Sequence, residues 1–150
     1  MDEINIEFMD SAGRVSDDPT GFPVVLVTVQ AACIKNRAEP EYGSVPTRTY
    51  ALIDTGAEGM LIDETLASST GFHQGRAVHV QGATSTMKTF ARPGLFSLEG
   101  GTHRYSGNFV ATPLKENGCR YLVIIGMDFI SKGALTLDFK NRVFKLAVGG

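Results

Sequence analysis

Short apolar runs, separated by glycine, proline and asparagine, form the dominant pattern along this sequence. Ile4, Ile6 and Phe8 alternate with polar residues and predict a first strand. The apolar, β-branched run at 24–34 is long enough for a buried strand, and residues 47–53 predict the next one. Similar runs predict further strands at 60–62, 95–98, 105–111, 121–125, 135–139 and 143–148.

Helices are predicted in two short segments. Asp63 can cap a helix that continues through Ala67 and ends near Gly71. Residues 127–132 predict a helical turn that closes at Gly133. Because no long amphipathic helix separates the strands, a βαβ fold is disfavoured. The pattern therefore predicts an all-β barrel or folded sheet with one or two short helices.

The segments between the predicted strands are expected to form different kinds of loop and turn. Residues 11–23 are polar and rich in glycine and proline, so the first 23 residues are expected to include a loop or a loose N-terminal arm. Residues 35–46 predict a surface loop, and the Thr/Val-rich segment 78–90 predicts a mobile hairpin. A turn at 140–142 is expected to join the last two strands as a hairpin. The length of 150 residues fits a single domain, 1–150.

Composition and charge exclude several classes of partner. Hydrophobic residues make up 43% of the chain, which is enough to build a packed core. The net charge of −2 gives no basic surface for phosphate contacts, so a nucleic-acid partner is not expected. The longest apolar runs, 24–27 and 122–125, are too short to cross a membrane.

The N-terminal residues and the cysteines suggest a reducing compartment. The acidic N-terminus lacks the apolar core of a secretory signal, so a cytoplasmic protein is expected. Cys33 and Cys119 form no Cys-x-x-Cys pair, and both are predicted to be buried free thiols. His73, His79 and His103 do not have metal-ligand spacing, so neither a metal nor a cofactor is expected.

The segment most suggestive of chemistry is Asp54-Thr55-Gly56-Ala57, which follows the apolar run Ala51-Leu52-Ile53. A strand here delivers a carboxylate into a tight turn, in which glycine permits close backbone approach and the threonine hydroxyl can brace the turn. By itself the tripeptide also fits an Asx turn in an ordinary loop. A carboxylate at the end of a buried strand nevertheless needs partners, because burying it unpaired is costly.

A second segment makes the pattern more specific. Leu122-Val123-Ile124-Ile125-Gly126-Met127-Asp128-Phe129-Ile130 follows some distance later, and Leu135-Thr136-Leu137-Asp138-Phe139 comes next. Together with the Asp-Thr-Gly segment, these residues resemble the retroviral-type, or retropepsin-like, aspartic peptidases over roughly residues 50–146. The resemblance implies an acid-protease barrel that functions as a homodimer.

The resemblance also implies roles for individual residues. Asp54 would be catalytic, in an active-site loop with Thr55, Gly56 and Ala57. Ile124, Ile125 and Gly126 would pack beneath that loop, and the helix at 128–132 would support the dimer. A flap would close over the substrate with its tip near 82–86. The implied flap and substrate-binding residues are Glu58, Gly82, Ala83, Thr84 and Ser85.

Two features depart from the viral pattern. Many viral relatives carry arginine after the later glycine, where it pairs with an acid near the catalytic turn, whereas this chain has Met127. An ion pair to Glu58 would then be missing or would use another residue, namely Arg48, Arg92 or Arg142. The chain also continues to a strand at 143–148, which suggests that a C-terminal hairpin forms the dimer interface.

The leading functional hypothesis is an endopeptidase in which two Asp54 carboxylates activate a water for hydrolysis of an extended peptide or protein substrate. Only one Asp-Thr-Gly is present, so a second copy of the chain is required. The alternative is a non-catalytic module of the same fold that binds peptides or dimerises. Asp63, Glu64 and Asp138 are interpreted as capping or surface charges, and the phenylalanines mainly as core or interface residues.

Overall fold

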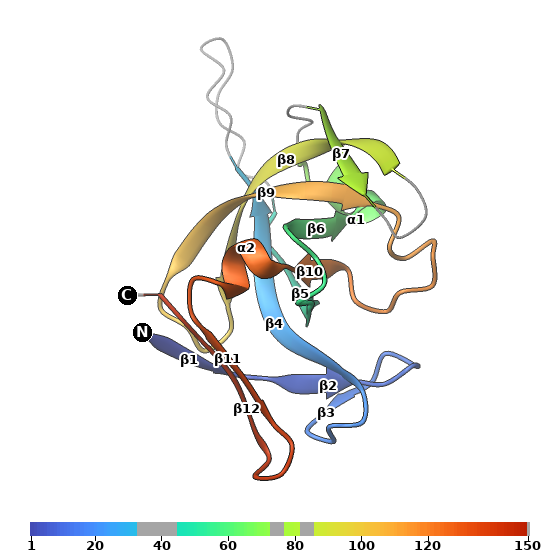
Figure 1. Cartoon of the computed structure of the whole chain (residues 1–150). Helices are drawn as coiled ribbons and strands as arrows, with labels where there is room; N and C mark the ends of the chain where they lie inside the picture. The colour runs from blue at the N-terminus through green and yellow to red at the C-terminus, as the bar shows by residue number, and fades with distance from the viewer. Residues whose placement is uncertain (33–44, 73–76, 82–85, 150) are drawn as a thin grey trace.

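The computed structural model describes residues 1–32, 45–72, 77–81 and 86–149, which form twelve strands and two short helices (Figure 1). The strands are β1 (Asp2–Asn5), β2 (Glu7–Met9), β3 (Val15–Ser16), β4 (Phe22–Ala31), β5 (Thr47–Ile53), β6 (Met60–Asp63), β7 (Ala77–Gln81), β8 (Thr86–Leu98), β9 (Arg104–Thr112), β10 (Val123–Ile125), β11 (Ala134–Asp138) and β12 (Val143–Val148). The helices are α1 (Glu64–Ser69) and α2 (Met127–Ile130).

Six strands close into a barrel in the order β4-β5-β10-β6-β9-β8, because β8 pairs again with β4. The first residues of β4 pair with β2 and its last residues pair with β8. Strand β4 therefore belongs both to the barrel and to the part of the sheet formed with β2 and β3. Strand β7 joins the outer part of β8 as a hairpin across the upper side of the barrel in Figure 1. The predicted all-β barrel with short helices is therefore confirmed.

Aromatic side chains fill one end of the barrel interior. The Phe96 ring lies 5.9 Å from the Phe109 ring and 5.0 Å from the Phe129 ring, both in edge-to-face contact. Phe72 adds a further contact with Phe109 at 5.6 Å. Phe109 is completely buried, so replacing it with alanine should cost roughly 3–5 kcal/mol of stability. Phe96, Phe109 and Phe129 are core residues, as predicted.

The first residues of the chain are built into the fold rather than forming a loose arm. Ile4, Ile6 and Phe8 are at most 5% exposed and belong to the main core. The single strand predicted around them is divided in two at Ile6, whose N–H donates to the Phe144 carbonyl at 3.0 Å. Strand β1 pairs with β12 in a separate three-stranded sheet, β1-β12-β11, while β2 joins the main sheet. We call the three-stranded unit the terminal sheet.

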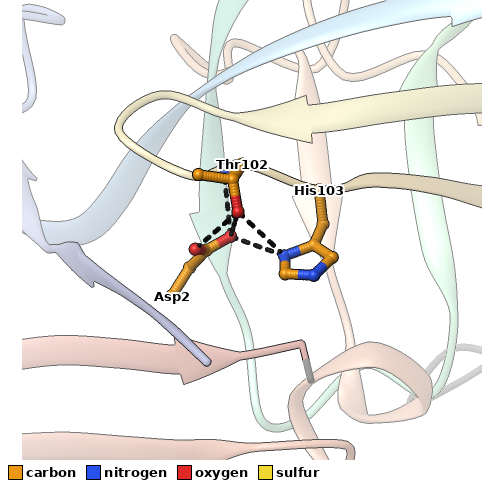
Figure 2. A network of polar contacts seen from close by, with 3 residues as sticks. All are labelled: Asp2, Thr102 and His103. Carbon is orange, nitrogen blue, oxygen red and sulfur yellow. Dashed lines mark hydrogen bonds and ion pairs between the residues drawn. The ribbon is translucent and has the colours of Figure 1, made fainter.

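A carboxylate secures the beginning of the terminal sheet. Asp2 accepts hydrogen bonds from the Thr102 N–H at 2.7 Å and the Thr102 hydroxyl at 3.0 Å, and His103 Nδ1 lies 2.9 Å from it (Figure 2). Thr102 and His103 lie in the turn between β8 and β9. The hydrogen bonds from His103 and from the Thr102 backbone lower the pKa of Asp2 to about 2. This network ties the N-terminal strand to the barrel.

Both predicted helical segments are helical, but only α1 begins with a side-chain cap. Asp63 caps α1 through a hydrogen bond from the Leu66 N–H at 3.1 Å, as predicted. It is not a surface charge, however, because it is 2% exposed and its second oxygen accepts the Lys115 N–H at 2.9 Å. Helix α2 is shorter than the predicted turn and begins after Gly126, which provides no side-chain cap.

The predicted hairpin at 78–90 is present as β7 and the first part of β8. Strand β8 then continues without a break through the separately predicted strand at 95–98. The predicted tip residues Gly82, Ala83, Thr84 and Ser85 lie outside the described residues, as does most of the predicted loop at 35–46. The backbone of β8 therefore connects the hairpin directly to the barrel wall.

Candidate active site

The strand that carries Asp54 lies between two others. Strand β5 pairs antiparallel with β4 on one side and parallel with β10 on the other. Its last residues, Ala51, Leu52 and Ile53, are at most 8% exposed, which explains the apolar run before the carboxylate. The pairing continues one residue further, because the Asp54 N–H donates to the Ile125 carbonyl at 3.0 Å. The Cα of Asp54 is therefore fixed by the sheet.

Two backbone amides shape the turn that follows. The Gly56 N–H donates to Asp54 Oδ1 at 2.8 Å, and the Ala57 N–H donates to the Asp54 carbonyl at 3.2 Å. The first of these bonds is charge-assisted when the carboxylate is ionised. Thr55 is exposed, and its hydroxyl has no hydrogen-bond partner among the described residues. Gly56 and Ala57, rather than the threonine side chain, therefore brace the turn within one chain.

The start of α2 supports the turn from below. The Met127 N–H donates to the Ala57 carbonyl at 2.8 Å, and the Asp128 N–H donates to the Glu58 carbonyl at 2.7 Å. These contacts require glycine at position 126, since a Cβ there would lie 2.3 Å from the Gly59 carbonyl oxygen. The free amides of the first helical turn thus find partners in the turn that follows Asp54.

The two isoleucines before Gly126 point to different apolar clusters. Ile125 is fully buried in the main core, whereas Ile124, at 7% exposed, belongs to a second cluster with Leu52 and Leu114. This second cluster lies on the other face of β5 and β10, since side chains alternate along a strand. The predicted support residues Ile124 and Ile125 therefore lie on β10, which pairs with the strand that carries Asp54, and Gly126 follows them.

A cavity of about 910 Å³ opens beside the carboxylate. The turn after Asp54 forms one wall with Asp54 and Glu58, strand β9 contributes Asn108, α2 contributes Asp128, and Lys132 follows that helix. His79 of the hairpin also lines it. Its volume falls in the range of known ligand-binding clefts. The cavity thus brings together Asp54, Glu58 and His79 of the hairpin.

The ion pair considered for Glu58 is not formed within the described part of the chain. Arg48 pairs with Glu99 at 3.2 Å, and Arg92 donates instead to the Phe72 carbonyl at 3.1 Å. Arg142 occupies the β11–β12 turn, where its φ is 55°. Glu58 is exposed and lines the cavity. Among the described residues, no arginine or lysine therefore forms an ion pair with Glu58.

An aromatic pair near Asp54 was missed by the sequence analysis. Phe22, at the start of β4, and Tyr121, just before β10, meet edge to face with their ring centres 6.0 Å apart. Burial, a hydrogen bond with Cys119 and the nearby Asp54 charge raise the pKa of Tyr121 to about 12. The phenol is therefore neutral at ordinary pH. The pairing of β5 with β4 on one side and with β10 on the other brings these distant residues together.

Neither a metal cluster nor a membrane helix is found in the described ranges. No group of three or more histidine, cysteine or acidic residues there has the geometry to hold a metal ion. Likewise, none of the described helices has the length and apolar character needed to span a membrane. Cys119 is a free, half-buried thiol, whereas Cys33 and His73 lie outside the described residues.

Comparison with known families identifies the family of this chain. A family model described as aspartyl protease matches residues 42–129, which include the catalytic turn, the hairpin and the start of α2. The chain belongs to the aspartyl protease family. No curated protein matches the sequence.

Comparison with a solved structure shows which fold this chain has. The chain is similar to the EIAV protease solved in complex with the inhibitor HBY-793, with a TM-score of 0.54 and 16% sequence identity. The similarity covers 80% of this chain and 97% of the viral one. At this level of identity the match establishes a shared fold. The predicted retropepsin-like fold of this aspartyl protease is therefore confirmed.

Proposed function

We propose that this aspartyl protease is an endopeptidase that acts as a homodimer, with one Asp54 from each subunit. The observation that supports the proposal most directly is the placement of Asp54. Its backbone is fixed between two strands, its carboxylate is half-buried, and that carboxylate opens onto a large cavity. Among the described residues its carboxylate accepts one hydrogen bond, from Gly56, so most of its acceptor capacity is available for water and substrate.

The chemistry requires two carboxylates with different protonation states. Two facing acids cannot both ionise easily, so the pair holds one proton and titrates in two separated steps. The ionised Asp54 takes a proton from water while the water oxygen attacks the peptide carbonyl carbon. The protonated Asp54 gives its proton to the carbonyl oxygen, and the tetrahedral intermediate forms. The C–N bond then breaks as the amide nitrogen receives the proton that one carboxylate took from water, while a hydroxyl of the intermediate returns its proton to the other carboxylate and becomes the new carbonyl.

The terminal sheet supplies a surface suited to a second copy. Strand β11 has β12 as its neighbour on one side, and no described strand pairs with its other edge. Leu137, Phe139 and Val143 on the same hairpin are 36%, 56% and 39% exposed. Unpaired edges and exposed apolar side chains favour association with another chain. Thr55, exposed beside Asp54, is likewise available to a partner subunit.

The shape of the cavity favours an extended peptide as substrate. Its walls come from the catalytic turn on one side and from strands β7 and β9 on the other. An extended chain in such a groove can add main-chain hydrogen bonds to strand edges, while pockets select its side chains. The exposed Glu58 carboxylate at the cavity wall provides an acceptor for peptide N–H groups.

Subunit mixing tests the proposal more sharply than a single inactive variant. The Asp54→Asn protein and the wild type are mixed in varying ratios, allowed to exchange subunits, and assayed with a peptide library. If each site needs two Asp54 carboxylates, activity falls with the square of the wild-type fraction. A linear decrease would show that one carboxylate is sufficient and would refute the shared site.

The matched control is Asp17→Asn, which neutralises an exposed carboxylate in the segment before β4. Mixing this variant with the wild type should leave activity unchanged at every ratio. Full cleavage by Asp54→Asn alone would refute an aspartic mechanism. Peptide binding without cleavage by the wild type would instead support the non-catalytic module.

A further inference from the structure

The outer face of the barrel carries a row of polar side chains that crosses strands β5, β4, β8 and β9. The register of these strands places Thr28 between Arg48 and Ser97, and it places Ser97 opposite Arg104. Because opposed residues of adjacent antiparallel strands point to the same face, all four side chains lie on one side of the sheet. The residues before and after Thr28 are buried in the main core, so this row faces away from the barrel interior.

A cavity of about 210 Å³ opens on this row, and we call it the outer cavity. Strands β4, β8 and β9 supply most of its lining: Thr28, Gln30, Leu95, Ser97 and Arg104. Of the described residues, Phe96 alone lines both this cavity and the larger one beside Asp54. The outer cavity is therefore separate from the site proposed for peptide hydrolysis.

The polar groups of the outer cavity offer hydrogen-bond donors. The Arg104 guanidinium donates one bond to Gln30 Oε1 at 3.3 Å, and it forms no ion pair with a described carboxylate. Its other N–H groups can therefore donate to a ligand. The hydroxyls of Thr28 and Ser97 have no hydrogen-bond partner within the described ranges. A guanidinium beside two hydroxyls is a donor set that matches the oxygens of an anion.

Charge and size narrow the class of ligand. Arg48 pairs with Glu99 at 3.2 Å, so these two charges offset one another at the edge of the row. Among the described lining residues there is no carboxylate, and Arg104 supplies a positive charge without a counterion. The volume of about 210 Å³ is below the range of roughly 300–1,000 Å³ that is usual for pockets enclosing a whole ligand. The outer cavity therefore suits a single anionic group.

We propose that the outer cavity is an oxyanion site that binds a phosphate group through Arg104, Thr28 and Ser97, as the free ion or attached to a peptide. The guanidinium presents parallel N–H donors to two phosphate oxygens, and the two hydroxyls donate to the remaining oxygens. A phosphate group binds better than a carboxylate here, because it offers more acceptor oxygens and carries a charge of roughly −1.5 to −2 at pH 7. The site is independent of the proposed endopeptidase function.

Titration of the isotope-labelled protein with inorganic phosphate, followed by NMR, tests the site at the level of single residues. The amide resonances of Thr28, Ser97 and Arg104 should shift saturably, with a Kd on the order of 1 mM. Arg104→Gln should weaken phosphate binding about tenfold, because it removes the charge and the paired donors. Arg14→Gln is the matched control, since it neutralises another exposed arginine, just before β3, and should leave the Kd unchanged.

The two hydroxyls provide an independent measurement. Thr28→Val and Ser97→Ala remove one donor each and keep the backbone pairing of their strands, so each should weaken phosphate binding about threefold. An unchanged Kd in Arg104→Gln would overturn the site. Equal shifts with sodium chloride at matched ionic strength would do the same, and so would the absence of any loss in both hydroxyl variants.

Matched peptides distinguish the two sources of the phosphate group. Peptides of one sequence with phosphoserine, glutamate or serine at the central position are titrated into the Asp54→Asn protein, so that cleavage cannot interfere. Tighter binding of the phosphoserine peptide than of inorganic phosphate, lost in Arg104→Gln, would support a phosphorylated segment as the ligand. Weaker binding of that peptide than of inorganic phosphate would support the free ion. Equal affinities of the phosphoserine and glutamate peptides would overturn the preference for phosphate.

Discussion

Asp54 and Asp2 both accept a hydrogen bond from a backbone amide, yet their surroundings differ. Asp2 receives the Thr102 N–H, the Thr102 hydroxyl and His103, and its pKa falls to about 2. Asp54 receives only the Gly56 N–H among the described residues and borders a large cavity. The first carboxylate has its acceptor positions filled by the fold, whereas the second keeps them available. The comparison suggests that unused hydrogen-bonding capacity, rather than residue type, distinguishes a reactive acid from a structural one.

Neutralising Asp54 should produce the largest functional effect. We expect Asp54→Asn to reduce kcat about 10⁴-fold, because the amide can neither accept a proton from water nor share one with its partner. Stability should change little, since asparagine can still accept the Gly56 N–H. Steady-state cleavage and urea unfolding measure the two effects. A variant that lost both activity and stability would place Asp54 with the structural carboxylates.

Position 126, which lies beneath the turn after Asp54, should be the position most sensitive to added side-chain volume. A Cβ at position 126 would lie 2.3 Å from the Gly59 carbonyl oxygen and 2.7 Å from that of Ala57. Gly126→Ala should therefore cost about 3 kcal/mol of unfolding free energy and displace the turn. Gly107→Ala is the matched control, since a Cβ there would lie 3.7 Å from its nearest neighbour, a Phe96 ring atom. Gly100 is unsuitable because its φ is positive. Similar losses in both variants would contradict this explanation.

Asp63 is an intermediate case, because its carboxylate is buried but accepts hydrogen bonds from two backbone amides. Asp63→Ala should cost about 2 kcal/mol, because it removes the cap of α1 and leaves the Lys115 N–H without its acceptor. Asp63→Asn retains an acceptor oxygen and should cost less. Thermal or urea unfolding of both variants measures the difference. If Asp63→Asn proved as unstable as Asp63→Ala, the negative charge rather than the acceptor geometry would be the stabilising feature.

Removing the Asp2 network should have the smallest effect at neutral pH and a distinct signature in acid. Its folded-state pKa lies below the ordinary value of 3.8, so its contribution to stability is present above pH 3.8 and is lost as the pH falls toward 2. The wild type should therefore lose more stability than Asp2→Asn between pH 5 and pH 2, which urea midpoints at both pH values measure. Parallel curves for the two proteins would rule out this carboxylate as a contributor to acid unfolding.

The sequence predicted the elements that depend on local pattern. Apolar, β-branched runs identified most of β4 and β5, and the Asp63 cap located α1 correctly. Asp54 was singled out because an apolar run ends directly at Asp-Thr-Gly and a second apolar segment, ending at Gly126, follows later in the chain. The strands and α1 require only neighbouring residues, so they can be read along the chain.

Long-range pairing accounts for what the sequence did not predict. The break at Ile6 exists because β1 finds its partner in β12 and β2 finds its partner in β4. The contact of Asp2 with Thr102 spans 100 positions, and that of Phe22 with Tyr121 spans a similar distance. Polar and aromatic side chains in such contacts carry no local signature, since their partners depend on which strand edges meet.

Strand β7 has consequences for how Asp54 is reached. Within the described residues it pairs with β8 alone, whereas β5 is hydrogen-bonded on both sides. Amides of a one-sided strand exchange with solvent through local opening that leaves the barrel intact. Because His79 of β7 lines the cavity, such opening would alter the cavity wall while β5 stays paired on both sides. Local opening of β7 and global unfolding are therefore separate events with separate energies, and hydrogen exchange should resolve them as two populations of amides.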